Sequence, residues 1–151
     1  RFEDWQRIEE LLRAIAQEGA LPVIPWGVGK WLGRRGEVVQ RMIEAPGLPL
    51  FFVGDNANRP TFWPKPRHFQ RAREHGIRNL PGSDPLPFPE DVRRVGRFGG
   101  VVTGDVNRET PAEDLKQILL DPTSQFSPFG QEERLFPFVR RQLKMQVRKL
   151  L

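Results

Sequence analysis

Three short apolar segments recur at intervals of roughly thirty residues, and each runs into a turn rich in glycine and polar residues. They are residues 21–25 before Trp26-Gly27, residues 48–53 before Gly54-Asp55-Asn56, and residues 77–80 before Gly82-Ser83-Asp84. Short, continuous apolar runs are typical of strands buried on both faces of a parallel sheet. The spacing leaves room for a helix between successive strands, so it predicts βαβ units.

The segments around these strands carry helical signals. Apolar residues spaced three and four apart predict helices over 4–18, 30–45 and 66–75. After residue 84 the pattern changes: 96–103 is predicted to be one more strand, and Thr110, Pro111 and Glu113 predict a capped helix over 110–120. The predicted fold class is therefore α/β, with parallel βα units in residues 1–120, a Pro/Ser/Gly-rich linker at 121–130 and a basic amphipathic helix at 131–151.

Composition bounds the class of protein. The chain has 151 residues, of which 38% are hydrophobic and 28% charged, as expected for one globular domain. It has no cysteine, which excludes a disulfide framework and fits a cytoplasmic protein. No apolar run is long enough for a transmembrane helix. The chain begins at Arg1 inside a helical pattern, which predicts that an upstream portion is missing.

The charge balance favours an anionic partner. There are 24 Lys and Arg against 19 Asp and Glu, a formal net charge of +5. A phosphate- or carboxylate-bearing substrate, nucleic acid or a membrane surface would each suit this balance. The C-terminal helix is especially basic and could bind nucleic acid, a membrane surface or a partner protein. The alternative is an ordinary solvated basic surface.

Two aspartates follow neighbouring predicted strands. Asp55 and Asp84 lie where α/β proteins usually place their chemistry, at the carboxyl ends of strands. Carboxylates in such positions can hold a divalent cation or act as acid and base. Either aspartate could instead stabilise a turn by accepting backbone N–H groups.

Further residues near these strand ends are candidate substrate contacts. Trp26 could stack on a ring, while Asn56, Arg59 and Lys65 could bind polar or anionic groups. Alternatively, Trp26 covers the end of the sheet and the basic loop is simply solvated. A further alternative is an open flavodoxin-like sheet with its ligand at the Gly27–Lys30 turn. The glycines from Gly27 to Gly33 fit neither nucleotide-binding pattern, so tight turns are the simpler interpretation.

Gly82-Ser83-Asp84 after an apolar strand resembles the late-strand motif of the polymerase-and-histidinol-phosphatase (PHP) and amidohydrolase-type metal hydrolases. Val53-Gly54-Asp55-Asn56 resembles the preceding strand end of the same proteins. The resemblance covers about residues 20–105 and implies the C-terminal part of a (β/α) barrel. It implies Asp84 as a ligand of zinc or manganese or as general base, with Asp55 as its partner. Where the family has histidines, this chain has Pro85-Leu86 and Trp26.

These observations give two hypotheses for function. The first is a divergent metal-dependent hydrolase acting on a small anionic substrate, with ligands from missing upstream strands or with the metal lost. The second is a non-catalytic module that uses its basic loop and C-terminal helix to bind nucleic acid, a membrane or a partner protein.

Overall fold

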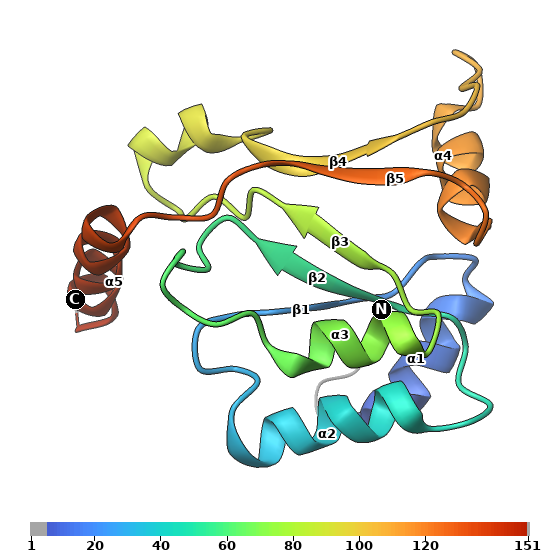
Figure 1. Ribbon diagram of the computed structural model, residues 1–151, viewed down its shortest axis with the longest axis horizontal. Coiled ribbons are helices and arrows are strands. Elements are labelled where there is room, and N and C mark those ends of the chain that lie inside the picture. The colour runs from blue at the N-terminus through green and yellow to red at the C-terminus, as the bar shows by residue number, and fades with distance from the viewer. Residues whose placement is uncertain (1–5, 151) are drawn as a thin grey trace.

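The structure is a computed structural model that describes residues 6–150 (Figure 1). Within that range a three-stranded parallel sheet is followed by a two-stranded antiparallel ribbon and a C-terminal helix. The helices are α1 (Ile8–Gln17), α2 (Gly33–Glu44), α3 (Arg67–Glu74), the 3₁₀ helix η1 (Pro89–Arg94), α4 (Pro111–Leu120) and α5 (Leu135–Leu150). The strands are β1 (Val23–Pro25), β2 (Phe52–Asn56), β3 (Asn79–Gly82), β4 (Phe98–Val102) and β5 (Phe126–Gly130).

The parallel sheet has the strand order β1-β2-β3, so the strands lie in chain order. Helix α2 connects β1 to β2, and α3 connects β2 to β3. Figure 1 shows both helices on the same face of the sheet. The mixed α/β class and the parallel βα units predicted from the sequence are confirmed. The start predicted for the first helix, residue 4, lies outside the described residues.

The core fills the space between the sheet and the helices α1, α2 and α3. It joins Leu12 of α1, Met42 of α2, Val53 of β2 and Phe69 of α3, each at most 3% exposed. Burying a side chain of this kind contributes on the order of 1.5–3 kcal/mol. This common core fixes the helices to one face and leaves the carboxyl ends of the strands at one edge.

Helices α2 and α3 also contact each other near Gly36. A Cβ atom at Gly36 of α2 would overlap the backbone carbonyl of Trp31, so glycine is required there. The ring of His68 packs edge-on against Trp31, and its Nε2 lies 3.0 Å from the Gly36 carbonyl oxygen. His68 therefore joins the two helices.

The antiparallel ribbon of β4 and β5 lies beside β3. Residues 126–130, expected to belong to a linker, form β5 because β4 supplies a complete set of partners from Phe98↔Gly130 to Val102↔Phe126. Pro128 is tolerated because the ribbon has free edges, where a missing N–H costs little. The ribbon is fixed to β3 by Ser83 Oγ, which donates to the Phe98 carbonyl oxygen at 3.2 Å.

Two local predictions differ from the structure. The capping box at Thr110 is not formed: its side chain makes no cap hydrogen bond, and Asp114 Oδ2 accepts the backbone N–H of Asn107 instead, at 2.7 Å. Strands β2 and β3 extend past their apolar runs into the turns, so Asp55 lies within β2 and pairs with Pro81. Within residues 6–150, no helix combines the length and the apolar character needed to cross a bilayer.

Candidate functional site

The carboxyl ends of the three parallel strands are joined by residues 55–60, here called the strand-end loop. Asn56 Nδ2 donates to the Trp26 carbonyl oxygen after β1 at 2.9 Å. Asn58 Nδ2 donates to the Asp84 carbonyl oxygen after β3 at 2.5 Å. Asn56 Oδ1 accepts the backbone N–H of Asn58 at 3.0 Å. The side chains of Asn56 and Asn58 therefore connect the three turns by donating hydrogen bonds to main-chain carbonyl oxygens.

Asp55 and Arg59 form a buried ion pair inside this loop. Arg59 Nε donates to Asp55 Oδ1 at 2.9 Å and Nη2 donates to Oδ2 at 2.8 Å, a two-pronged arrangement. Their side chains are only 7% and 5% exposed. Burial by itself would lower the pKa of Arg59, but the bonds from Asp55 and Glu132 outweigh it and raise that pKa. The Arg59 guanidinium therefore stays charged although it is buried.

The ion pair continues into a larger network between the strand-end loop and the segment before α5. Arg59 also donates to Glu132, and the Arg59 carbonyl oxygen accepts the N–H of Glu133 at 3.1 Å. Glu133 in turn accepts hydrogen bonds from Arg94 of η1 and Arg141 of α5. The network thus connects β2, η1 and α5.

Sequence reasoning did not predict the other members of this network. Glu132, Glu133, Arg94 and Arg141 are far from Asp55 in the chain and follow no motif. The sequence pointed to them only indirectly. Once Asp55 and Arg59 are buried, their remaining polar atoms need further partners.

The structure places the predicted site residues in different environments. Trp26 is 3% exposed and its indole belongs to the core. Asp84 is exposed, has a positive φ of 41°, and its Oδ2 lies 3.5 Å from Asn58 Nδ2. Lys65 is exposed beside α3. Asn56 and Arg59 are buried and make the contacts described above.

The described residues do not fit the divalent metal that the resemblance implies. Within residues 6–150, no three His, Asp or Glu side chains lie close enough together to hold a metal ion. Both carboxylate oxygens of Asp55 are occupied by Arg59. Asp84 has only an amide beside its carboxylate. A metal site needs several oxygen or nitrogen ligands, which these residues alone do not assemble.

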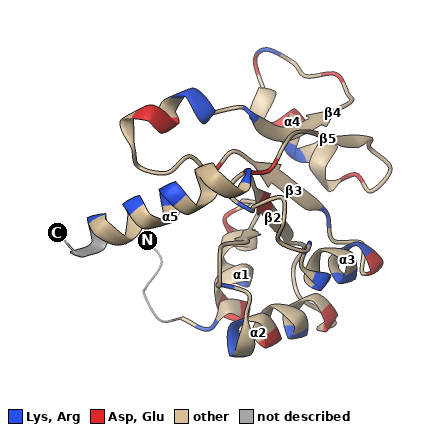
Figure 2. Ribbon diagram, turned by 60° about the vertical axis from the view of Figure 1, so that its left-hand side comes forward, with Lys and Arg blue, Asp and Glu red and all other residues tan. Residues whose placement is uncertain are grey.

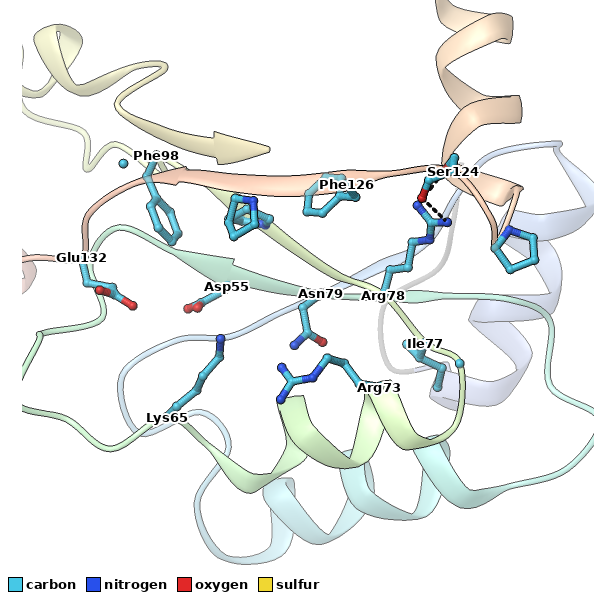
Figure 3. Close-up of a pocket in the computed structure, with 15 residues that line it drawn as sticks. Asp55, Lys65, Arg73, Ile77, Arg78, Asn79, Phe98, Ser124, Phe126 and Glu132 are labelled. Carbon is cyan, nitrogen blue, oxygen red and sulfur yellow. Dashed lines mark hydrogen bonds between the residues drawn. The ribbon is translucent and has the colours of Figure 1, made fainter. Parts of the chain in front are cut away.

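A cavity of about 620 Å³ lies between α3, β3 and the β4–β5 ribbon, here called the α3–ribbon cavity (Figure 3). Val53 pairs with Asn79, and Asp55 pairs with Pro81. Residues paired in this way point to the same side, so all four side chains lie on the helix face of the sheet. Apolar surface comes from both sides of the cavity, from Ile77, Pro81, Phe98 and Phe126. Cavities of this size commonly hold small molecules.

Polar groups converge on the same space. Figure 3 shows Lys65 and Arg73 extending beneath Asp55 and Asn79. Neither cation has a carboxylate partner among residues 6–150. Asn79 Nδ2 donates to the Phe69 carbonyl oxygen at 3.2 Å, while its Oδ1 is buried and has no partner among the described residues. Arg78, by contrast, is bound to Ser124 Oγ at 2.9 Å.

Comparisons with known proteins add no assignment: no protein-family model matches the chain, and neither a curated protein nor a solved structure is significantly similar to it.

Proposed function

We propose that the chain binds a small organic anion, one that carries a phosphate or carboxylate group, in the α3–ribbon cavity. The observation that supports this most is the pair of cations, Lys65 and Arg73, which line an apolar-sided cavity without carboxylate partners within the described chain. Elsewhere in the cavity wall Asp55 and Glu132 contribute negative charge, but Arg59 binds both. The net field from Lys65 and Arg73 therefore favours an anion.

The lining also favours a particular kind of anion. Arg73 can bind two oxygens of a phosphate or carboxylate at once, and Lys65 can add a point charge. Ile77, Phe98 and Phe126 offer apolar surface to a carbon skeleton. The ligand class is therefore a small organic phosphate or carboxylate, of which sugar phosphates are examples.

We also propose that the three βα units belong to a (β/α) barrel. The chain-order strands and the helices on a single face support this, because doubly wound sheets carry helices on both faces. Metal-dependent hydrolysis, predicted from the family resemblance, would need ligands from outside residues 6–150. Binding of an anion needs only groups already present, so it is the function that these residues support best.

Thermal unfolding and calorimetric titration test the anion proposal. Glycerol 3-phosphate and ribose 5-phosphate are expected to raise the unfolding midpoint of the chain, whereas glycerol and ribose are not. Arg73→Met should weaken binding about tenfold or more, because a charge-assisted hydrogen-bonded pair is lost. Arg41→Met, which removes an exposed cation from α2, is the matched control and should bind as well as the original chain. Equal binding by both variants would refute the cavity as the site.

A further inference from the structure

Helix α5 rests on the body of the protein through its polar side. Arg141 donates to Glu133 and lies 3.1 Å from Asp91, Lys144 pairs with Glu90 of η1, and Arg148 donates to the Pro87 carbonyl oxygen. A surface helix usually packs most of its apolar side chains on the body.

A second row of apolar side chains on α5 faces solvent. The outer stripe consists of Phe136, Val139, Leu143 and Val147, which are 83%, 44%, 63% and 57% exposed. Residues two apart on a helix lie about 200° apart around its axis, so Leu143 points away from the side that Arg141 anchors. An exposed apolar patch of this kind marks a binding surface.

The outer stripe is straight. From Phe136 to Val147 it advances eleven positions, about 3.67 per turn over three turns, close to the 3.6 of a straight helix. A heptad seam through Phe136, Val139 and Leu143 would need an apolar residue at position 146, where the chain has Gln146. The stripe therefore suits a flat surface better than a supercoiled partner helix.

Charge narrows the choice of surface. Residues 134–151 contain Arg134, Arg140, Arg141, Lys144, Arg148 and Lys149 and no Asp or Glu. Figure 2 shows the basic residues distributed along α5, which projects from the body. A second copy of α5 would place cations against cations. Nucleic acid is bound mainly through cations and would gain nothing from the exposed apolar stripe, whereas a lipid surface can use both.

We propose that the outer stripe of α5 binds an anionic lipid surface, with the helix lying in the plane of the headgroups. Phe136 and Leu143 would enter the boundary between headgroups and acyl chains, and Arg140, next to the stripe, would meet lipid phosphates and carboxylates. Because the stripe faces away from the contacts with η1, binding needs no rearrangement of the body.

Vesicle flotation with the full 151-residue chain tests this. The chain should float with vesicles of phosphatidylcholine mixed with phosphatidylserine, and much less with phosphatidylcholine alone. Leu143→Glu should reduce the bound fraction about tenfold or more, because it buries a charge in place of an apolar group and repels anionic lipid. Leu115→Glu, at another exposed leucine that lies on α4, should float like the original chain. Unchanged unfolding midpoints for both variants would show that the fold is intact.

Three outcomes would overturn the proposal. One is no flotation with anionic vesicles, and a second is equal flotation of Leu143→Glu and the original chain. A third is a concentration-dependent dimer in sedimentation velocity that Leu143→Glu abolishes while vesicles do not compete; a second copy of the chain would then cover the stripe.

Discussion

The strand-end loop and the α3–ribbon cavity are adjacent, but their charged side chains lie in different environments. In the loop, Asp55 and Arg59 are buried and satisfy each other with two hydrogen bonds. In the cavity, Lys65 and Arg73 carry charge without a carboxylate partner among residues 6–150. A buried charge needs a partner within the protein because its desolvation is costly. A partly exposed charge stays hydrated and remains available to a ligand.

This difference separates residues that hold the fold together from residues that we propose bind a ligand. The sequence placed Asp55, Arg59 and Lys65 in one candidate site because they are close along the chain. In the structure Asp55 and Arg59 hold the loop to Glu132, and Lys65 faces the cavity. Removing a loop charge should therefore cost stability, and removing a cavity charge should cost binding.

The largest effect is expected for Arg59→Met. It leaves the Asp55 carboxylate, 7% exposed, without a counter-charge, which costs about 3–5 kcal/mol of unfolding free energy. Urea unfolding followed by circular dichroism measures the loss. Arg67→Met removes an exposed arginine at the start of α3 and should change stability by less than about 0.5 kcal/mol. Equal stability of the two variants would contradict the loop's structural role.

The sequence was sufficient for the parallel βα units because their signals are local. Apolar runs and helical periodicity encode β1 to β3 and α1 to α3, and the recurrence of turns correctly grouped Trp26, Asn56 and Asp84 at one edge. Glycines with positive φ at Gly29 and Gly33 confirm the tight turns before α2.

The remainder depends on contacts between distant segments. Glu132 and Glu133 follow β5, so they lie beside Arg59 and Arg94 because β5 pairs with β4. The cavity also forms only where that ribbon approaches α3, so Arg73 and Asn79 carried no signal as ligand-binding residues. The orientation of α5 depends on its ion pairs with η1 and on the contact of Phe138 with Phe62, so periodicity alone could not predict it.

Asn58→Ala tests the neutral part of the loop. Asn58 is 7% exposed, and its side chain holds the turn after β3 through the Asp84 carbonyl oxygen. Leaving that buried partner unsatisfied should cost about 1–3 kcal/mol, less than the loss of Arg59. The matched control is Asn107→Ala, an exposed asparagine whose Oδ1 accepts the N–H of Glu109. If both alanines cost the same, the loop gains nothing from burial.

The exposed ion pair of Glu90 and Lys144 is intermediate between the charges of the loop and those of the cavity, because its members are paired but not buried. The hydrogen bond from Lys144 lowers the pKa of Glu90 below its ordinary 4.5. The ionised carboxylate therefore contributes its stability above pH 4.5, and that contribution is lost as pH falls through the lower pKa of the folded state. Comparing urea midpoints of the original chain and Glu90→Gln from neutral to acidic pH should show a small difference that disappears in acid. A difference that grows in acid would contradict the assigned pairing.

Lys65→Met should have the smallest effect on stability and so gives the sharpest contrast with Arg59→Met. Lys65 is exposed, and its Nζ makes a distant aromatic contact, 5.8 Å from the centre of the Phe69 ring. Losing that contact should change the unfolding free energy by less than about 0.5 kcal/mol. The same variant should lose most of the stabilisation given by ribose 5-phosphate, because the ligand's counter-charge is gone. A loss of stability like that of Arg59→Met, or an unaltered response to the sugar phosphate, would mean that the charges of the loop and the cavity serve the same purpose.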